Sequence, residues 1–352
     1  MYKMGIVGYG GMGSWHHRKL ADFREIEVTA AYDIKEERRK LAMENGLAVY
    51  QSLEEILADE AIDIILIATP NNFHKEYAVK ALRAGKNVIC EKPVTIGSAE
   101  LEEIIKVQKE TGKLFSVHQN RRWDKDFRIV KKVLEDNTIG TPFYIESRVQ
   151  GSKGVPGDWR CVKEAGGGML YDWGVHLIDQ IMWMVKSPVV EVYAHILSVK
   201  FKDVDDNFKL LLKFENGLSA LIEVDTYTFI ALPRWHVSGD EGTMVVKDWA
   251  CEGEIVKAKV TEMKWEESIV QTASGPTKTM APRPVEALQT LELPEIETNS
   301  IAYYENIVAV LNGKEELIVK PEEALRVMNV IDAAFLSAEK GEAIHTLSLI
   351  HI

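Results

Sequence analysis

Residues 4–33 read MGIVGYGGMGSWHHRKLADFREIEVTAAYD. An apolar run, residues 4–7, leads into GYGGMG at residues 8–13, and a second apolar run, residues 28–32, ends at Asp33. This order predicts a strand, a glycine turn, a helix, a second strand and an acidic residue, which is the layout of a dinucleotide-binding βαβ unit. The glycine pattern alone is a weak signal, but the flanking elements and the spacing between Gly13 and Asp33 also match the unit.

Three glycines of this turn have separate physical tasks. Gly8 makes the tight turn, Gly10 lets the backbone approach a pyrophosphate, and Gly13 lets the helix lie close to the strand. The helix that starts here offers unpaired N–H groups and the positive end of its dipole to phosphate. We therefore expect the whole loop to bind the cofactor: Gly8, Tyr9, Gly10, Gly11, Met12 and Gly13.

Asp33 decides which cofactor we expect. At the end of the second strand its carboxylate can accept hydrogen bonds from the adenosine ribose hydroxyls, with Ile34 beside it. A 2′-phosphate would meet a like charge there, and the next residues supply no arginine to bind it, although Lys35 is a nearby cation. We therefore predict NAD, with NADP as the less favoured cofactor.

The composition limits the classes of partner. The chain has 352 residues, enough for two domains, and a net charge of −12, with 54 acidic against 42 basic residues. Such a balance gives no basic field to attract nucleic acid or an anionic membrane. The three cysteines form no CxxC pattern, so we expect no disulfide framework, no cysteine zinc site and a reducing, cytoplasmic environment. No apolar run approaches the ~20 residues of a membrane span.

Strands and helices alternate from residue 3 to about residue 120, which predicts an α/β domain with an open, mostly parallel sheet. In such sheets the functional residues lie beyond the carboxyl ends of the strands. The polar clusters of this half all fall at such ends: residues 8–13, Asp33, residues 69–74, residues 91–93 and residues 119–123. Their agreement predicts a single site along that edge.

The second half of the chain reads differently. Consecutive strands dominate residues 189–260 and predict a large, mostly antiparallel, open sheet, while residues 271–298 read as a loop and two helices close the chain. We expect a dinucleotide-binding domain over residues 1–122 and a substrate-binding and oligomerisation α/β domain over residues 123–352, whose last helices can pack back on the first domain. A sheet too large for its helices to cover predicts a homodimer or homotetramer. Candidates for its open face are Phe201, Leu211, Tyr227 and Trp235.

Asp172 and His176 lie four residues apart on a predicted helix, so both project from one face, directly after three glycines. His176 has the pKa range of a general base at neutral pH. Together with Asp179 the pair could hold a metal only with a further ligand that we do not find in the sequence, so we predict no metal site. Lys92 ends a strand beside the predicted cofactor and is the third candidate.

Four motifs in a fixed order carry a resemblance that covers residues 3 to about 343. They are GYGGMG at the start, TPNNFH at residues 69–74, EKP at residues 91–93 and GGGMLYDWGVHLID at residues 166–179. With them the chain resembles the glucose–fructose oxidoreductase / inositol dehydrogenase (Gfo/Idh/MocA) family of sugar and polyol dehydrogenases. Residues 119–124, QNRRWD, are also similar to a subset of that family related to scyllo-inositol dehydrogenases.

The resemblance implies a Rossmann domain followed by an α/β domain whose open sheet supports oligomers, and a set of site residues. It implies Lys92, Asp172 and His176 as the catalytic set and a cis bond between Lys92 and Pro93. As substrate contacts we expect the same three residues and Arg121, whose guanidinium offers donors to the hydroxyls of a polyol. The resemblance also implies further cofactor contacts beyond the glycine loop, Asp33 and Ile34. These are Thr69, Pro70, Asn71, His74, Glu91, Lys92, Gln119, Trp159 and Arg160.

The expected function is hydride transfer between a nicotinamide and a hydroxyl-bearing carbon of a sugar, an inositol or a related cyclic polyol. We assign His176 as the base, Lys92 as the cation that stabilises the alkoxide, and Asp172 as the group that orients both. Two alternatives remain open: a glycoside hydrolase that uses tightly bound NAD for transient oxidation, and a non-catalytic dinucleotide-binding sensor.

Overall fold

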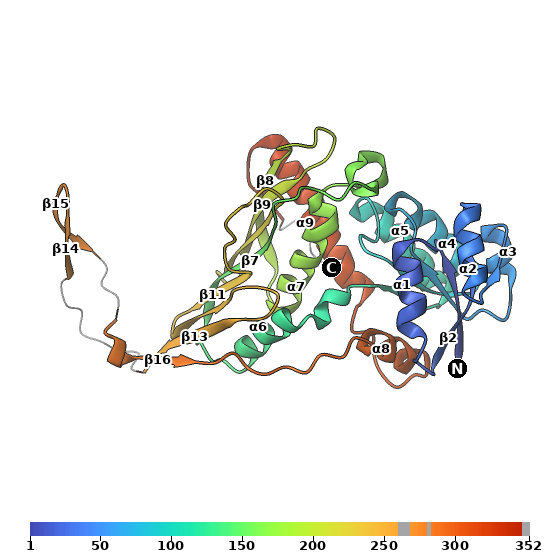
Figure 1. The fold of residues 1–352 in the computed structure, drawn as a ribbon, viewed down its shortest axis with the longest axis horizontal. Helices are drawn as coiled ribbons and strands as arrows, with labels where there is room; N and C mark the ends of the chain where they lie inside the picture. Colours follow the sequence, from blue (N-terminus) through green and yellow to red (C-terminus); the bar gives the residue numbers. More distant parts are fainter. Residues whose placement is uncertain (260–267, 280–282, 347–352) are drawn as a thin grey trace.

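The computed structural model describes residues 1–259, 268–279 and 283–346. Six parallel strands form the first sheet in the order β3-β2-β1-β4-β5-β6, which is the Rossmann order (Figure 1). From β1 the chain adds strands toward one edge of the sheet (β2, β3), and from β4 it adds them toward the other edge (β5, β6). A crevice for a ligand is expected where this order switches, at the carboxyl ends of β1 and β4. The strands are β1 (Tyr2–Val7), β2 (Ile26–Tyr32), β3 (Ala48–Val49), β4 (Ile64–Ile67), β5 (Asn87–Cys90) and β6 (Phe115–Val117).

The helices of this domain cover both faces of the sheet, which explains why β4 is apolar and buried along its whole length. The serine side chain at position 52 caps α3, because its hydroxyl accepts the N–H of Glu55 at 3.1 Å. The helices are α1 (Gly11–Leu20), α2 (Glu36–Glu44), α3 (Leu53–Ala58), α4 (His74–Arg83) and α5 (Ser98–Thr111).

Nine strands form the second sheet, in the order β16-β13-β12-β11-β7-β10-β9-β8-β17. The pair β7 and β10 is parallel and the other pairs are antiparallel, so the predicted fold class is confirmed. The strands are β7 (Pro142–Gln150), β8 (Val189–Leu197), β9 (Asn207–Phe214), β10 (Ser219–Asp225), β11 (Trp235–Gly239), β12 (Gly242–Val246), β13 (Gly253–Ala258), β16 (Leu288–Leu291) and β17 (Ile344–His345).

Helices cover the face of this sheet that is turned toward the Rossmann domain: α6 (Lys125–Glu135), α7 (Val175–Met184) and α9 (Pro321–Lys340) (Figure 1). The other face carries exposed apolar side chains, among them Tyr193 and Leu211, which lie opposite each other on β8 and β9. The sequence made Trp235 a candidate for this open face, but the structure does not place it there. It is fully buried on the helix side, where its indole N–H donates to Asp126 of α6 at 2.8 Å.

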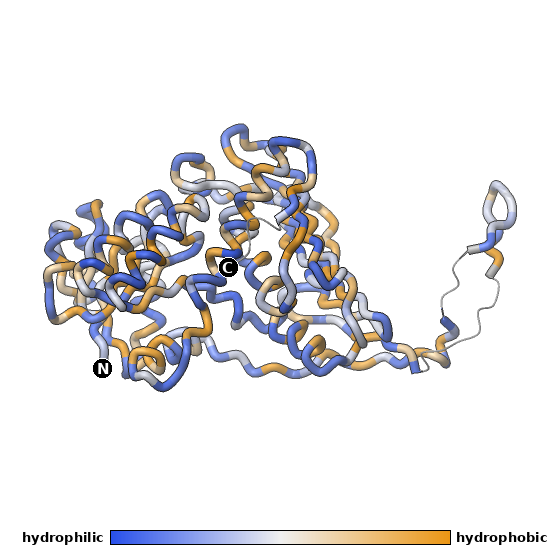
Figure 2. Tube along the Cα trace, turned by 180° about the vertical axis from the view of Figure 1, so that it is seen from behind, coloured by the Kyte–Doolittle hydropathy of each residue, from blue (hydrophilic) through white to orange (hydrophobic). Residues whose placement is uncertain are grey.

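The last helices connect the two domains. An extended stretch, residues 292–300, runs from β16 to α8 (Ala302–Leu311), which lies beside α1 of the Rossmann domain (Figures 1 and 2). From α9, the carboxylate of Asp332 accepts the main-chain N–H of Ser98 at 2.8 Å. The N-terminus of α5 in the first domain is therefore tied to α9 of the second domain.

The prediction of a loop over residues 271–298 is wrong in part. The structure places a hairpin of β14 (Ser268–Thr272) and β15 (Gly275–Thr279) there, followed by the edge strand β16. Gly275, the first residue of β15, has a φ of +116°, which glycine adopts without strain. The polar, Thr-rich composition hid the alternation of the strands. Among the described residues no helix is both long and apolar enough to cross a membrane.

Candidate active site

The glycine turn has the shape of a phosphate cradle. Gly8 has a φ of +93°, and a Cβ atom added there would meet the carbonyl oxygen of Ala68 at 2.6 Å. A Cβ atom on Gly13 would meet the carbonyl oxygen of Gly8 at 2.0 Å, so α1 can lie this close to β1 only with glycine. Gly10 and Gly11 face open space at the start of α1. These residues therefore fit a dinucleotide pyrophosphate.

Asp33 holds the turn together from the end of β2. One carboxylate oxygen accepts the N–H of Tyr9 at 2.8 Å and the other accepts the N–H of Lys35 at 2.9 Å. The ring of Tyr9 is buried beneath the turn with its hydroxyl 2.7 Å from Nδ1 of His17, whereas Ile34 is exposed. The structure thus brings the glycine loop and the predicted ribose-binding acid into direct contact.

Lys92 and Asp172 meet across the two domains. The Nζ atom of Lys92, which precedes a cis bond to Pro93, lies 2.9 Å from Oδ1 of Asp172 and 3.0 Å from its carbonyl oxygen. The Nε atom of Arg160 lies 2.8 Å from Oδ2 of the same carboxylate. Burial acts to raise the pKa of Asp172, but the charges of Lys92 and Arg160 outweigh it and lower this pKa below its ordinary value.

His176 stands one helical turn after Asp172 and is buried, and its Nδ1 atom has no hydrogen-bond partner among the described residues. Burial, together with the charges of Lys92 and Arg121, lowers the pKa of His176 well below the usual histidine value. The imidazole is therefore neutral at pH 7 and can accept a proton.

The segment that carries Asp172 is a π-helix, η5 (Leu170–Gly174), which continues into α7. The sequence predicted an ordinary helix here, so the π-helix is a difference from that prediction. A Cβ atom on Gly168 would meet Oδ1 of Asp205 at 2.0 Å, and the other oxygen of Asp205 accepts the N–H of Leu170 at 2.7 Å. Asp205 therefore caps the helix that carries Asp172 and His176, and π-turns are frequent at functional sites.

Two residues of the TPNNFH motif support the site from below. The ring nitrogens of His74 lie 2.9 Å from the carbonyl oxygens of Pro93 and Thr69, so this buried ring holds the Lys92–Pro93 segment against the end of β4. The side-chain amide of Asn71 donates to the carbonyl oxygen of Gly166 at 3.1 Å and links the motif to the glycine run of the second domain. Thr69 and Pro70 precede both residues and connect β4 to the short 3-10 helix η1 (Asn71–Phe73), which Pro70 precedes directly.

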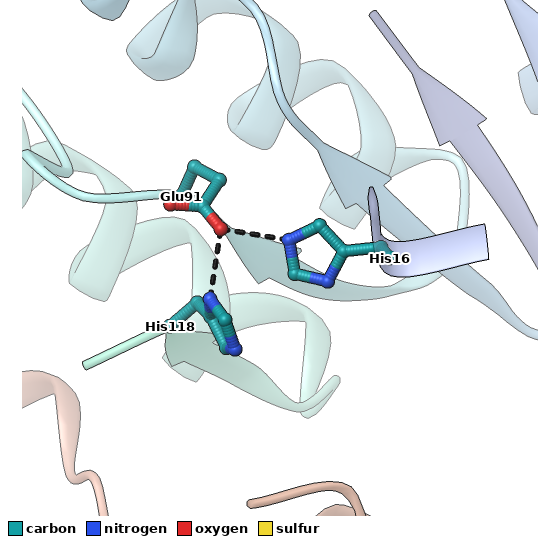
Figure 3. A group of neighbouring side chains, drawn as sticks. All are labelled: His16, Glu91 and His118. Carbon is teal, nitrogen blue, oxygen red and sulfur yellow. Dashed lines mark hydrogen bonds and ion pairs between the residues drawn. The ribbon is translucent and has the colours of Figure 1, made fainter. Parts of the chain in front are cut away.

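Glu91 is the centre of a buried cluster with His16 and His118 (Figure 3). Its Oε1 atom accepts Nε2–H of His16 at 2.7 Å and Nδ1–H of His118 at 2.8 Å, while Oε2 accepts the N–H of Lys92 at 3.2 Å. Burial disfavours the charge on Glu91, but His118 and His16 hold its pKa well below the usual value. The hydroxyl of Tyr304 on α8 completes the network at Nδ1 of His16.

Two imidazoles and a carboxylate are also a set of metal ligands. However, both nitrogen–oxygen distances are those of hydrogen bonds, and a metal ion would have to replace both N–H protons. We therefore assign the cluster as a hydrogen-bond network that connects α1, the Lys92 segment and the end of β6. The other metal set considered, with Asp179, does not form either, because Arg122 binds both oxygens of Asp179 at 2.6 and 2.8 Å.

The remaining predicted residues divide between the site and its walls. Gln119 follows His118 in the chain and is buried, and its Oε1 atom has no hydrogen-bond partner among the described residues. Arg121 pairs with Asp124 at 2.8 Å and lies 4.2 Å over the ring of Trp173, whereas Arg122 is buried and structural. Arg160 stacks on its neighbour Trp159 at 4.6 Å and reaches Asp172 with the same guanidinium.

Sequence reasoning missed four residues at the site: His16, His118, Trp249 and Asp205. None of them belongs to a motif, and each comes from a different element, so only the fold brings them to the candidate catalytic residues.

Comparison with known proteins agrees with this architecture. The family model described as an oxidoreductase family with an NAD-binding Rossmann fold matches residues 2–119, and that of the GFO/IDH/MocA C-terminal domain matches residues 127–245. The scyllo-inositol 2-dehydrogenase (NADP(+)) IolW of Bacillus subtilis is 28% identical over 97% of this chain and 95% of its own length. An inositol 2-dehydrogenase of Salmonella typhimurium is 28% identical over 63% of this chain and 66% of its own.

Among solved structures, an NAD-binding protein from Listeria innocua is 48% identical and superimposes with a TM-score of 0.93, covering 98% of this chain and 99% of that one. The glycine cradle, the two-domain architecture and these matches lead to one conclusion. The chain belongs to the Gfo/Idh/MocA family of oxidoreductases, with an NAD(P)-binding Rossmann domain followed by the family's C-terminal domain.

Proposed function

We propose that the protein is an NAD-dependent dehydrogenase that acts on a hydroxyl-bearing carbon of a cyclic sugar or inositol. The observation that carries this proposal is the contact of Lys92 with Asp172, with the neutral His176 one turn away. The names of two relatives, a scyllo-inositol 2-dehydrogenase and an inositol 2-dehydrogenase, support the substrate class.

The cofactor would be held by the cradle at residues 8–13 and by Asp33, with the nicotinamide toward Lys92 and Gln119. Open space at Gly10 and the unpartnered Oε1 atom of Gln119 fit these roles. When bound, the nicotinamide supplies the acceptor for the hydride that leaves the substrate carbon. The protein then has to move only a proton and to stabilise a charge.

His176 takes the hydroxyl proton in this proposal, because it is neutral and its Nδ1 atom is free of protein partners in the described structure. Lys92 stabilises the oxygen as the proton leaves, and Asp172 fixes Lys92 in place through two oxygens. Arg160 holds the second carboxylate oxygen, so Asp172 cannot turn toward His176 without breaking an ion pair.

The preference for NAD over NADP rests on Asp33. Both its oxygens already accept backbone N–H groups, so the carboxylate is fixed where a 2′-phosphate would approach. The B. subtilis relative is described with NADP, which makes this preference a point to measure in this chain.

One panel of assays tests the function and separates the alternatives. The protein is mixed with NAD or NADP and with sugars, inositols and simple alcohols, and the absorbance of reduced nicotinamide is followed. Reduction with a cyclic polyol is the expected result. Cleavage of a glycoside without net reduction of NAD would support the glycoside hydrolase instead. Binding of NAD without turnover of any compound would support the non-catalytic sensor.

A further inference from the structure

Two tryptophans, Trp173 and Trp249, lie beside the proposed catalytic residues and have no role in the proposed reaction. The ring of Trp173, next to Asp172 in η5, lies 6.0 Å from the ring of His176 and 5.8 Å from the ring of Trp249. Trp249 comes from the turn after β12, far from the catalytic residues in sequence. Two ring-to-ring steps therefore separate the proposed base from an indole of another element.

Trp249 is held in place and yet remains open. Trp249 as a whole residue is 52% exposed, although guanidinium groups lie over its ring at 4.7 Å (Arg234) and 5.7 Å (Arg121). Arg121 lies over Trp173 as well, at 4.2 Å, so the two indoles and this guanidinium form one continuous wall. Arg234, in contrast, is buried, and it anchors the inner end of the wall in the sheet with 2.9 and 3.0 Å hydrogen bonds to the Ser147 hydroxyl and the Arg148 carbonyl.

This combination is unusual for a residue that serves only the fold. A large apolar side chain that contributes to a core is buried, as Trp235 is, whereas half of Trp249 faces outward next to a catalytic centre. Ordered exposed aromatic rings are typical of binding sites, where they supply a large contact area at a small cost in conformational entropy.

We propose that Trp249, with Arg121 and Trp173, forms the wall against which the ring of the substrate lies. This inference rests on the proposed function and narrows its substrate class. An indole offers a flat apolar surface and needs an apolar partner face. A six-membered ring with mostly equatorial hydroxyls has such a face, made of its C–H groups, while its rim of hydroxyls remains free for Lys92, Asp172 and His176. Axial hydroxyls on that face would lose their hydrogen bonds to water against the indole.

The test compares Trp249→Ala and Trp249→Phe with the wild type on three probes: scyllo-inositol, whose hydroxyls are all equatorial, myo-inositol, with one axial hydroxyl, and the acyclic hexitol sorbitol. Trp249→Ala should raise KM for the cyclic probes about 10-fold or more and change kcat by less than about 3-fold, since the residue does not touch the reacting atoms. Trp249→Phe should restore most of the loss. Activity toward sorbitol should not depend on residue 249.

Binding is measured separately by the fluorescence of the NAD-loaded protein, which reads the wall without turnover. The chain has eight tryptophans, so the part of the signal that Trp249→Phe removes belongs to Trp249. Cyclic polyols should change this part, and Met43→Ala, which deletes an exposed apolar side chain on α2, serves as the control variant.

The outcomes for the wall and for the proposed function are distinct. Turnover of cyclic polyols with the same KM in Trp249→Ala and wild type would overturn the wall and leave the dehydrogenase intact. The absence of turnover with every cyclic polyol would overturn the proposed dehydrogenase function. The fluorescence titration then tests the wall by itself, and the wall is wrong if no cyclic polyol alters the Trp249 signal. A change in the mass of the protein on Trp249→Ala would instead assign Trp249 to a subunit contact.

Discussion

Asp172 binds the ammonium group of Lys92 with two different oxygens, a carboxylate oxygen at 2.9 Å and its own main-chain carbonyl oxygen at 3.0 Å. The second contact depends on the backbone of the π-helix and is independent of the carboxylate. The position of Lys92 is therefore set by the way η5 is folded, and η5 is in turn capped by Asp205. The geometry of the proposed catalytic pair, Lys92 and Asp172, thus depends on both domains at once.

The first prediction concerns the loss of the two proposed catalytic groups. Lys92→Ala and His176→Ala should each lower kcat by roughly 10²–10⁴-fold, the usual contribution of general acid–base catalysis. The double variant should lose much less than the product of the two, because the groups act on the same oxygen. Steady-state kinetics with the best substrate of the panel provides the measurement.

Cofactor binding supplies the control for these variants. NAD affinity should change little in His176→Ala, which lies in the second domain, and strongly in Gly10→Val, which fills the open space of the cradle. If His176→Ala keeps nearly normal turnover while Lys92→Ala abolishes it, the proton passes through Lys92 and our assignment of the base is wrong.

The second prediction follows from the charges around His176. Because burial and the charges of Lys92 and Arg121 lower its pKa, the neutral base persists as the pH falls through the usual histidine range, and kcat/KM should stay constant there. Arg121→Gln removes a positive neighbour and should move the acidic limb of the profile upward. Glu91→Gln removes a negative neighbour and should move it further downward. Equal directions for the two variants would refute His176 as the titrating group.

Most of the fold and half of the site could be predicted from the sequence. Gly8, Gly13 and Asp33 are specified locally, since each has a defined position in a βαβ unit, and the structure confirms the unit itself. The cap of the π-helix at Asp172 could not be predicted, because Asp205, which accepts the N–H of Leu170 and fills the space beside Gly168, is 33 residues away from Asp172 in the chain. The position of Trp249 beside η5 could not be predicted either. No local sequence pattern distinguishes a tryptophan in a turn that packs on another element from one that faces only solvent.

The third prediction is a preference for NAD. The wild type should use NAD with a kcat/KM at least about 10-fold above that for NADP, because a 2′-phosphate would lie beside the fixed carboxylate of Asp33. Asp33→Asn keeps an acceptor for the loop and removes the charge, so the ratio should fall, mainly through better use of NADP. Arg39 donates to the carbonyl oxygens of Asp33 and Ile34, so its positive charge lies beside this position and would favour NADP once the charge of Asp33 is removed. Comparable use of both cofactors by the wild type would defeat this prediction.

The fourth prediction is assembly through the open face of the nine-stranded sheet, as a homodimer or homotetramer. Tyr193, Leu211 and Leu221 form an apolar row across β8, β9 and β10, and Tyr193 and Leu211 are exposed. Such a row on a monomer is unfavourable. Leu211→Lys should lower the mass measured by light scattering at micromolar concentration, whereas Met43→Lys on α2 should not. A monomeric wild type would contradict it.

The last prediction concerns Asp205 and the stability of the catalytic helix. Burial raises the pKa of Asp205 to about 6, with Asp206 as a like-charged neighbour, while its ordinary value is 3.8. The folded state therefore binds the proton more tightly than the unfolded state, so this group lowers the free energy of unfolding as the pH rises from about 4 to about 6, by a total of about 2–3 kcal/mol. Asp205→Asn retains an acceptor for the N–H of Leu170 and should remove this decrease, as measured by urea unfolding at several pH values.

The neighbouring carboxylate provides a control of opposite sign. Asp206 accepts the N–H groups of Val199, Lys200 and Phe201, and these hydrogen bonds outweigh its burial and lower its pKa. Its contribution to the free energy of unfolding is therefore present above pH 4 and is lost as the pH falls through the folded-state pKa. Asp206→Asn should destabilise the protein at pH 7, where Asp205→Asn should be neutral or stabilising. If both variants destabilise the protein equally at pH 7, the folded state does not disfavour the ionised form of Asp205. Its carboxylate then stabilises the helix as an ionised N-terminal cap does.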